Sequence, residues 1–240
     1  MTIDTESHRS PETILLPARG WRIDPRHALV AGALCWAGFV VVAWMVHSGR
    51  SVWIDQHGLI LWRHGADLRP VGPPWVLEGV RDVTALGGVV LRVIFTIAAL
   101  AALLFLRMRR EAVLLLATVV SGLLVETALK LWVGRPRPQI VPHLTEAGGM
   151  SFPSGHSFNS ALGFIAVALA FATFSARRSV RWTIIGTAMA GSMVVAWSRV
   201  WLGVHYPTDV MAGWLGGAGW AFLAAALLYP PAKAAANASA

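Results

Sequence analysis

The sequence predicts an all-α polytopic membrane protein, a bundle of six transmembrane helices with both the N- and C-termini in the cytoplasm. Three observations support this fold class. Of the 240 residues, 56% are hydrophobic and only 13% are charged, whereas a soluble domain of this length needs more polar surface. Apolar runs of about 20 residues, long enough to cross the hydrocarbon core as a helix, recur along the chain. Arginines are concentrated in short segments between these runs, as is typical of cytoplasmic loops.

Each apolar run is expected to be a helix, because backbone polar groups in lipid must be hydrogen-bonded within their own segment. The expected spans are residues 28–46, 86–106, 112–133, 157–176, 183–202 and 210–229. A polar cytoplasmic tail, residues 1–27, precedes the first span, which lacks a small-x-small cleavage site and so favours a retained helix over a signal peptide. Residues 28–229 therefore form one membrane domain, and the alanine-rich residues 230–240 are expected to be a flexible tail.

The short loops determine the expected orientation. The loops after the second and fourth spans contain Arg107, Arg109, Arg110, Arg177, Arg178 and Arg181. By the positive-inside rule, these loops are cytoplasmic, and residues 48–85, 134–156 and 203–209 lie outside. The net charge of +8 is distributed over such clusters, so we expect membrane lipids and not nucleic acid as partners. The absence of organelle signals favours a bacterial inner membrane.

The first outer loop, residues 48–85, allows two interpretations. Its tryptophan and aliphatic side chains are typical of an amphipathic stretch that lies in the membrane interface, and simple loop packing explains them equally well. Asp55, His57, His64 and Asp67 are residue types that bind metals, but they lack close ligand spacing. Cys35 is the only cysteine, so neither an intrachain disulfide nor a multi-cysteine metal site is expected.

Three polar segments adjoin the ends of spans on the outer side. Their sequences are KLWVGRPRP (130–138), PSGH (153–156) and SRVWLGVHYPTD (198–209). Lys130, Arg137 and Arg199 supply three cations, which indicate a polyanionic ligand such as phosphate. Ser154 and Gly155 precede an apolar helix, whose first N–H groups are free to bind an anion. These five residues are the candidate phosphate-binding site.

The histidines and an aspartate supply the candidate catalytic groups. His205 and Asp209 are four positions apart at a helix start, so the carboxylate is expected to hold one imidazole nitrogen and leave the other free. We predict that neutral His205 attacks phosphorus, that His156 donates a proton to the leaving oxygen, and that Asp209 stabilises the imidazolium. The cations take the place of a metal, so no metal or cofactor is expected. Since one histidine must be neutral and the other protonated, the pH profile is predicted to be bell-shaped.

These segments resemble the three-part signature of the type-2 phosphatidic acid phosphatase superfamily. The signature is KxxxxxxRP, then PSGH, then SRxxxxxHxxxD, and this chain has every fixed letter of it. The resemblance implies a helical bundle with its active site at the outer membrane boundary. It also implies a lipid phosphate substrate such as phosphatidate, phosphatidylglycerol phosphate or undecaprenyl pyrophosphate, cleaved by a lipid phosphatase.

Other functions remain open at this stage. The anion site could hold vanadate, as in soluble haloperoxidases of the same superfamily, and halide oxidation that needs vanadate and peroxide would reveal this. The charges could instead guide an anion in a transporter or scaffold, although repeat halves are missing and the polar residues are at span ends. A small sugar phosphate is a further possible substrate, and the oligomeric state is not indicated.

Several further polar residues have less specific roles. Arg135 is expected to be solvated or to face headgroups, and His143 to be solvated. Glu126 is one helical turn before Lys130 and is expected to pair with it or to pack as a polar group inside the bundle. Arg92 lies inside the second span without an identified partner.

Overall fold

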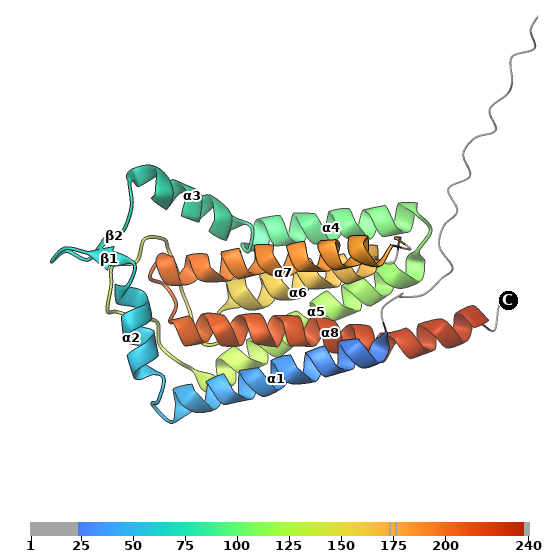
Figure 1. The fold of residues 1–240 in the computed structure, drawn as a ribbon, viewed down its shortest axis with the longest axis horizontal. Coiled ribbons are helices and arrows are strands. Elements are labelled where there is room, and N and C mark those ends of the chain that lie inside the picture. Colours follow the sequence, from blue (N-terminus) through green and yellow to red (C-terminus); the bar gives the residue numbers. More distant parts are fainter. Residues whose placement is uncertain (1–23, 173, 176, 238–240) are drawn as a thin grey trace, which may run out of the picture.

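The computed structural model describes residues 24–237 except 173 and 176, with side chains through residue 227. The long helices run side by side, and shorter helices and a small hairpin lie at one end of the bundle (Figure 1). The elements are α1 (Pro25–His47), α2 (Val52–Ile60), β1 (Arg63–His64), β2 (Arg69–Pro70), α3 (Pro74–Ala85), α4 (Val89–Phe105), α5 (Arg109–Val133), α6 (Gly155–Ala172), α7 (Arg178–Trp201) and α8 (Pro207–Asn237). We call the end that carries α2, β1, β2 and α3 the site end.

The helices confirm a polytopic membrane protein, with one change in the second span. In the described chain, five helices are long and apolar enough to cross a membrane, namely α1, α5, α6, α7 and residues 207–227 of α8. The sixth is α4, which has 17 residues and meets this criterion only together with α3, from which it is bent by 46°. The predicted span began at residue 86, but Gly87 and Gly88 separate the two helices. Two consecutive glycines favour such a break because they lack side chains.

The ends of the first and last helices differ from the predicted boundaries. Helix α1 begins at Pro25, inside the expected tail, and Asp24 caps it by accepting a hydrogen bond from the Arg26 N–H (2.9 Å). Helix α8 continues through Asn237, so residues 230–237 are helical where we expected a flexible tail. Alanine, the strongest helix former, is frequent in this segment. Residues 1–23, the rest of the predicted N-terminal tail, lie outside the described residues.

Helix α6 lies at the centre of the bundle and positions the site. It packs against α4, α5, α7 and α8, and Phe158, Leu162 and Ile165 are among its fully buried side chains. Glycines of α8 allow the closest approach: a Cβ on Gly217 would lie 2.0 Å from the Phe158 carbonyl oxygen, and one on Gly213 would lie 2.6 Å from the Ser154 carbonyl oxygen. Small residues are the usual means of close packing between membrane helices. The starts of α6 and α8 are thereby held together.

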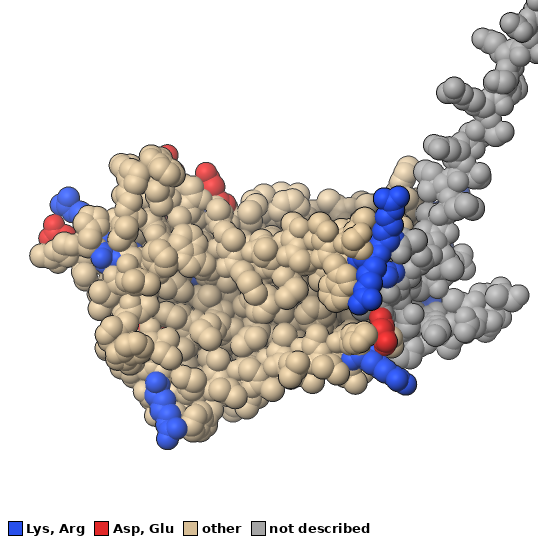
Figure 2. Space-filling model, in the orientation of Figure 1, with Lys and Arg blue, Asp and Glu red and all other residues tan. Residues whose placement is uncertain are grey.

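Charge is concentrated at the ends of the bundle. Figure 2 shows lysines and arginines at the end opposite the site end, while the visible side of the bundle is almost free of charge. The six arginines on which the predicted orientation rests lie at that end: two are in the α4–α5 and α6–α7 loops, and four are in the first turns of α5 and α7. We call it the basic end. Apolar side chains such as Leu34, Phe105 and Trp132 are exposed along the sides, as expected of a surface in contact with lipid.

Residues 48–85, predicted to be the first outer loop, fold onto the site end. Leu59 of α2 packs with Val200 and Val210 of α7 and α8, and the buried Arg63 donates to the Trp201 carbonyl oxygen (2.9 Å). Trp53 and Leu61 remain exposed. Helix α2 therefore has one face packed on the protein and one exposed apolar face. The first fits simple loop packing, and the second fits an amphipathic stretch in the membrane interface.

Candidate active site

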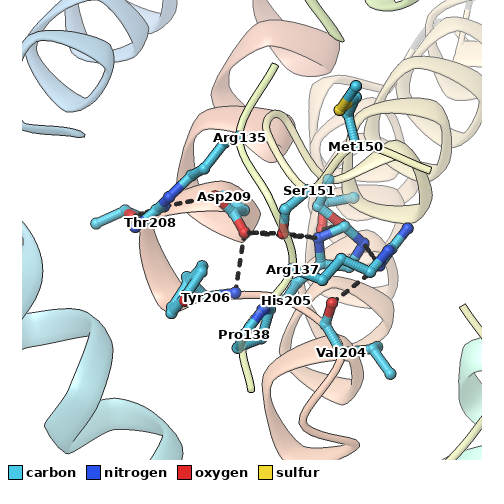
Figure 3. Close-up of polar contacts among 12 residues, drawn as sticks. Arg135, Arg137, Pro138, Met150, Ser151, Val204, His205, Tyr206, Thr208 and Asp209 are labelled. Atoms are coloured by element: carbon cyan, nitrogen blue, oxygen red, sulfur yellow. Dashed lines mark hydrogen bonds and ion pairs between the residues drawn. The ribbon is translucent and has the colours of Figure 1, made fainter. Parts of the chain in front are cut away.

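The three polar segments converge at the site end. The first leaves α5, the second enters α6, and the third joins the end of α7 to the start of α8. Figure 3 shows Arg137, His205 and Asp209 around the loop that contains Met150 and Ser151. Residues that are far apart in the chain thus share one site, because α5, α6, α7 and α8 all present an end here.

His205 and Asp209 form a buried pair. The His205 side chain is 2% exposed and that of Asp209 is 0%, and 3.7 Å separates Nδ1 of the imidazole from Oδ2 of the carboxylate. The Ser151 hydroxyl donates to the same Oδ2 (2.5 Å) and lies 3.3 Å from Nδ1. The backbone N–H of Tyr206 also donates to Oδ2 (3.0 Å). Asp209 and Ser151 therefore orient the imidazole through Nδ1.

The environment of His205 favours its neutral form. Burial, together with the nearby cations Arg137 and Arg199, lowers the pKa of His205 to about 4, although Asp209 acts in the opposite direction. At neutral pH the imidazole is uncharged. A neutral imidazole held through one nitrogen has a lone pair available on the other, as a nucleophile requires.

Arg137 lies against the free nitrogen of His205. Its Nη1 is 3.0 Å from His205 Nε2 and donates to the Val204 carbonyl oxygen (2.8 Å). Nη2 donates to the Gly148 carbonyl oxygen (2.7 Å). These backbone acceptors hold the guanidinium beside the nitrogen that would attack. Burial lowers the pKa of Arg137, and the charge of Asp209 opposes this shift.

Lys130 reaches the first turn of α6. Its Nζ pairs with Glu126 Oε1 (3.3 Å), which is one of the two alternatives predicted from their spacing. A Cβ on Gly155 would lie 2.9 Å from the Glu126 carboxylate and 3.3 Å from the Lys130 ammonium. Glycine at position 155 therefore allows the ammonium to approach the N-terminus of α6, where free N–H groups favour anions.

Ser154 connects α6 to α8. Its backbone N–H donates to the Asp209 carbonyl oxygen (2.9 Å), and its side-chain oxygen accepts from the Ser157 hydroxyl (3.1 Å). The side chain is fully buried. Ser154 thus fixes the start of α6 relative to Asp209, and its predicted role in binding phosphate stays a prediction.

His156 and Arg199 form the opposite wall, next to α3 and α4. Nη1 of the buried Arg199 donates to the Thr84 hydroxyl (2.8 Å), and its Nε has no hydrogen-bond partner among the described residues. His156 lies against Gly87, where a Cβ would be 3.3 Å from the imidazole Cδ2. It is also close enough to Arg199 and His205 to interact with both electrostatically. The eight residues predicted for the site are therefore brought together.

The structure corrects the prediction for Arg135. This residue was expected to face solvent or headgroups, but its side chain is 16% exposed and bridges two buried carboxylates, Asp209 Oδ1 and Asp55 Oδ2, at 2.6 Å each. Burial acts to lower the pKa of Arg135, but the two carboxylates outweigh this effect, so the pKa is raised. Asp55 also accepts from the Thr208 hydroxyl and backbone N–H (2.8 and 3.1 Å). The guanidinium lies 4.1 Å from the ring centroid of Tyr206.

Sequence reasoning missed Asp55, Thr208 and Ser151. Asp55 is 80 positions from Arg135, and no periodic pattern connects residues over such a distance. His143 is exposed, as predicted, and its Nε2 lies 2.7 Å from the Pro138 carbonyl oxygen. Within residues 24–237, apart from the two undescribed positions, no group of three or more His, Cys, Asp or Glu side chains is placed to hold a metal ion.

Comparison with known proteins identifies the family. Residues 110–232 match the PAP2 superfamily, and this segment contains all three polar motifs. The chain belongs to the PAP2 superfamily. This membership confirms the resemblance inferred from the signature letters.

The relatives of this PAP2 protein are phosphatases. Phosphatidylglycerophosphatase B of Bacillus subtilis is 32% identical over 143 residues, which are 58% of this chain and 69% of the relative. Lipid A 1-phosphatase of Rhizobium etli is 35% identical over 124 residues, 48% of this chain and 49% of the relative. Two other relatives are named undecaprenyl-diphosphatases, and the match covers about half the length of each. These names confirm the expected enzyme class, a phosphoric ester hydrolase.

A solved structure has the same fold. The crystal structure of the transmembrane PAP2-type phosphatidylglycerolphosphate phosphatase from Bacillus subtilis matches with a TM-score of 0.72 and 27% sequence identity. The match covers 80% of this chain and 93% of the other. Together with the apolar helices, it confirms that this PAP2 protein is a multi-pass membrane protein.

Proposed function

We propose that this PAP2 protein is a lipid phosphate phosphatase that works through a phosphohistidine at His205. The observation that carries the proposal is the position of His205, buried and neutral, held at Nδ1 by Asp209 and Ser151 and facing Arg137 at Nε2. An oriented neutral imidazole beside converging cations is suited to attack on a phosphate ester.

The first step transfers the phosphoryl group to the enzyme. Nε2 of His205 attacks phosphorus in line, a nitrogen–phosphorus bond forms, and the ester oxygen–phosphorus bond breaks. His156, in its protonated form, gives its proton to the departing oxygen. Asp209 stabilises the positive charge that develops on the imidazole ring.

The second step returns the enzyme to its starting state. Neutral His156 takes a proton from a water molecule, whose oxygen attacks phosphorus and displaces His205. Inorganic phosphate leaves, and His156 is again protonated. The atoms and charges balance without an oxidant, a reductant or a cofactor.

Charge on the transferred phosphoryl group is stabilised by the surrounding cations. Lys130, Arg137 and Arg199 supply positive charge, and Ser154 and the N–H group of Gly155 supply donors at the start of α6. In this mechanism these groups do what a divalent metal does in other phosphatases, so the reaction is proposed to be metal-independent.

The substrate is proposed to be a lipid at the outer face of the membrane. The site is at the end of a membrane bundle, where a phosphorylated headgroup meets water. The arginines of the basic end favour placing that end in the cytoplasm, which puts the site and the first outer loop on the periplasmic side of a bacterial inner membrane. The relatives' names support phosphatidylglycerol phosphate, undecaprenyl pyrophosphate or a similar lipid phosphate.

The test is phosphate release by the purified chain in detergent with excess chelator. The substrates are phosphatidate, phosphatidylglycerol phosphate, undecaprenyl pyrophosphate and glucose phosphate. We expect release from a lipid, with no effect of the chelator, and a loss of about 10⁴-fold or more in His205→Ala. Radiolabelled substrate should leave an acid-labile, base-stable phosphoryl group on the wild-type protein only.

Other results would reject the proposal. Release that persists in His205→Ala would exclude the phosphohistidine. Folded protein that cleaves none of the four substrates would reject the phosphatase and favour an anion carrier or scaffold. Halide oxidation that depends on added vanadate and peroxide, without ester cleavage, would favour the haloperoxidase alternative.

A further inference from the structure

A mostly apolar groove begins beside His156 and runs along α6. It has a volume of about 490 Å³ and lies between α4, α6 and α7. Its lining extends from Gly87 and Asn159 near the site end to Phe171 near the basic end. Along α6 the distance from Asn159 to Phe171 is roughly 18 Å at the α-helical rise, which is about the depth of one leaflet's hydrocarbon.

Arg92 gives the upper part of this groove a positive charge. It is in the first turn of α4 and lines the groove. No hydrogen bond or ion pair joins its guanidinium to another residue in the part of the chain that the structure describes. Glu126 is near enough to interact with it electrostatically, but that carboxylate is paired with Lys130 at 3.3 Å. A charged group in a membrane helix without a close partner is usually functional.

Asn159 adds an acceptor at the same level. Its side-chain Nδ2 donates to the Gly155 carbonyl oxygen (3.0 Å), whereas its buried Oδ1 has no hydrogen-bond partner within the described part of the chain. The residue is 5% exposed and lines the groove. A buried carbonyl oxygen without a donor costs free energy, which a bound ligand with a hydroxyl group would recover.

The groove continues from the side of the site where the leaving group departs. Gly87 lines it, and a Cβ on this glycine would lie 3.3 Å from the His156 ring. His156 also interacts electrostatically with Arg92. Since His156 is the proposed proton donor to the leaving oxygen, a leaving group attached to that oxygen would enter the groove at Arg92 and Asn159.

We propose that Arg92 and Asn159 select a leaving group that has a hydroxyl and an anionic phosphodiester ahead of its hydrocarbon chains, and that one chain lies in the α4–α6–α7 groove. Arg92 binds the phosphodiester and Asn159 Oδ1 accepts from the hydroxyl. The leaving group of phosphatidylglycerol phosphate has both the hydroxyl and the phosphodiester. That of phosphatidate lacks the phosphodiester, and that of undecaprenyl pyrophosphate lacks the hydroxyl. This inference rests on the proposed function and concerns its substrate class.

The test compares kcat/KM for these three lipids in mixed micelles, using the full chain and the variants Arg92→Gln and Asn159→Leu. We expect Arg92→Gln to lower kcat/KM for phosphatidylglycerol phosphate by about tenfold or more and that for phosphatidate by less than about twofold. Asn159→Leu should lower kcat/KM for phosphatidylglycerol phosphate and leave kcat/KM for undecaprenyl pyrophosphate unchanged. Arg69→Gln, which removes an exposed arginine of the hairpin at the same end, is the matched control.

The outcomes separate this inference from the proposed function. If the wild-type chain cleaves the lipids but each variant affects all three equally, the residues act on folding or general catalysis and the inference is wrong. If Asn159→Leu weakens cleavage of undecaprenyl pyrophosphate as much as that of phosphatidylglycerol phosphate, the hydroxyl contact is wrong. If the wild-type chain releases no phosphate from any lipid, the proposed function itself fails.

Discussion

The two sides of His205 differ in how their charges are compensated. On the Nδ1 side, Asp209 is surrounded by donors from Arg135, Ser151 and Tyr206. On the Nε2 side, Arg137 is held by backbone carbonyl oxygens, and no described carboxylate lies within ion-pair distance of Arg137 or Arg199. The first side is a closed network that fixes the nucleophile. The second is a concentration of positive charge suited to a phosphate, at the expense of stability in the free protein.

This difference predicts that substitutions on the Nδ1 side mainly affect stability. Asp55→Ala leaves the Arg135 guanidinium without one of its two buried carboxylates, and breaking a buried pair costs about 3–5 kcal/mol. We expect a large decrease in the thermal unfolding temperature in detergent. Asp67→Ala, which breaks the exposed pair with Arg69 on the hairpin, should have no measurable effect. Equal effects of the two substitutions would mean that the buried network does not stabilise the fold.

Substitutions on the Nε2 side are expected to affect catalysis more than stability. Arg137→Ala removes a cation next to the attacking nitrogen and should lower kcat by about 10²–10³-fold, the usual cost of losing one transition-state donor. The unfolding temperature should be unchanged or higher, since like charges are removed. Arg137→Lys is not expected to restore activity, because a lysine lacks the planar fork that also holds the Gly148 and Val204 carbonyl oxygens. A variant that unfolds as readily as Asp55→Ala would remove the distinction between the two sides.

The pH profile sharpens the comparison further. The nucleophile is active when His205 is neutral, so activity falls as the pH drops below its pKa. Because burial and the neighbouring cations lower this pKa to about 4, the acidic limb of kcat/KM assigned to His205 should be near pH 4 instead of the ordinary value near 6.5. Arg137→Ala removes one of those cations and should move the limb to higher pH. A limb that stays in place in this variant would show that Arg137 does not influence the nucleophile.

The smallest expected effect concerns Ser151. Ser151→Ala removes one donor to Asp209 but leaves those of Arg135 and Tyr206, so the carboxylate stays partly satisfied. We expect a loss of about 1 kcal/mol in stability and a decrease in kcat of less than about tenfold. Ser151→Thr keeps the hydroxyl and is the conservative comparison. If Ser151→Ala reduced activity as strongly as Arg137→Ala, the serine would have a direct part in the chemistry.

Local sequence patterns predicted most of the fold and of the catalytic set. The apolar runs located the spans to within a few residues at most ends, and the signature letters selected Lys130, His156 and His205. The break before α4 was missed, because the glycines at 87 and 88 interrupt a run that is apolar on average. Helix α2 and its packing against α7 and α8 were not predicted either, since hydropathy does not indicate which side of a short amphipathic helix meets protein.

The sequence by itself determined the membrane architecture and the enzyme class, and it selected the residues proposed for the phosphate site, because each depends on local composition or on a short motif. Only the tertiary structure decided the partners of those residues. Asp55 meets Arg135 through the folding of residues 48–85 onto the site end, and Arg92 and Asn159 share a groove because α4 packs beside α6. Such contacts depend on how helices distant in the chain pack together, and neither hydropathy nor motif spacing encodes that arrangement.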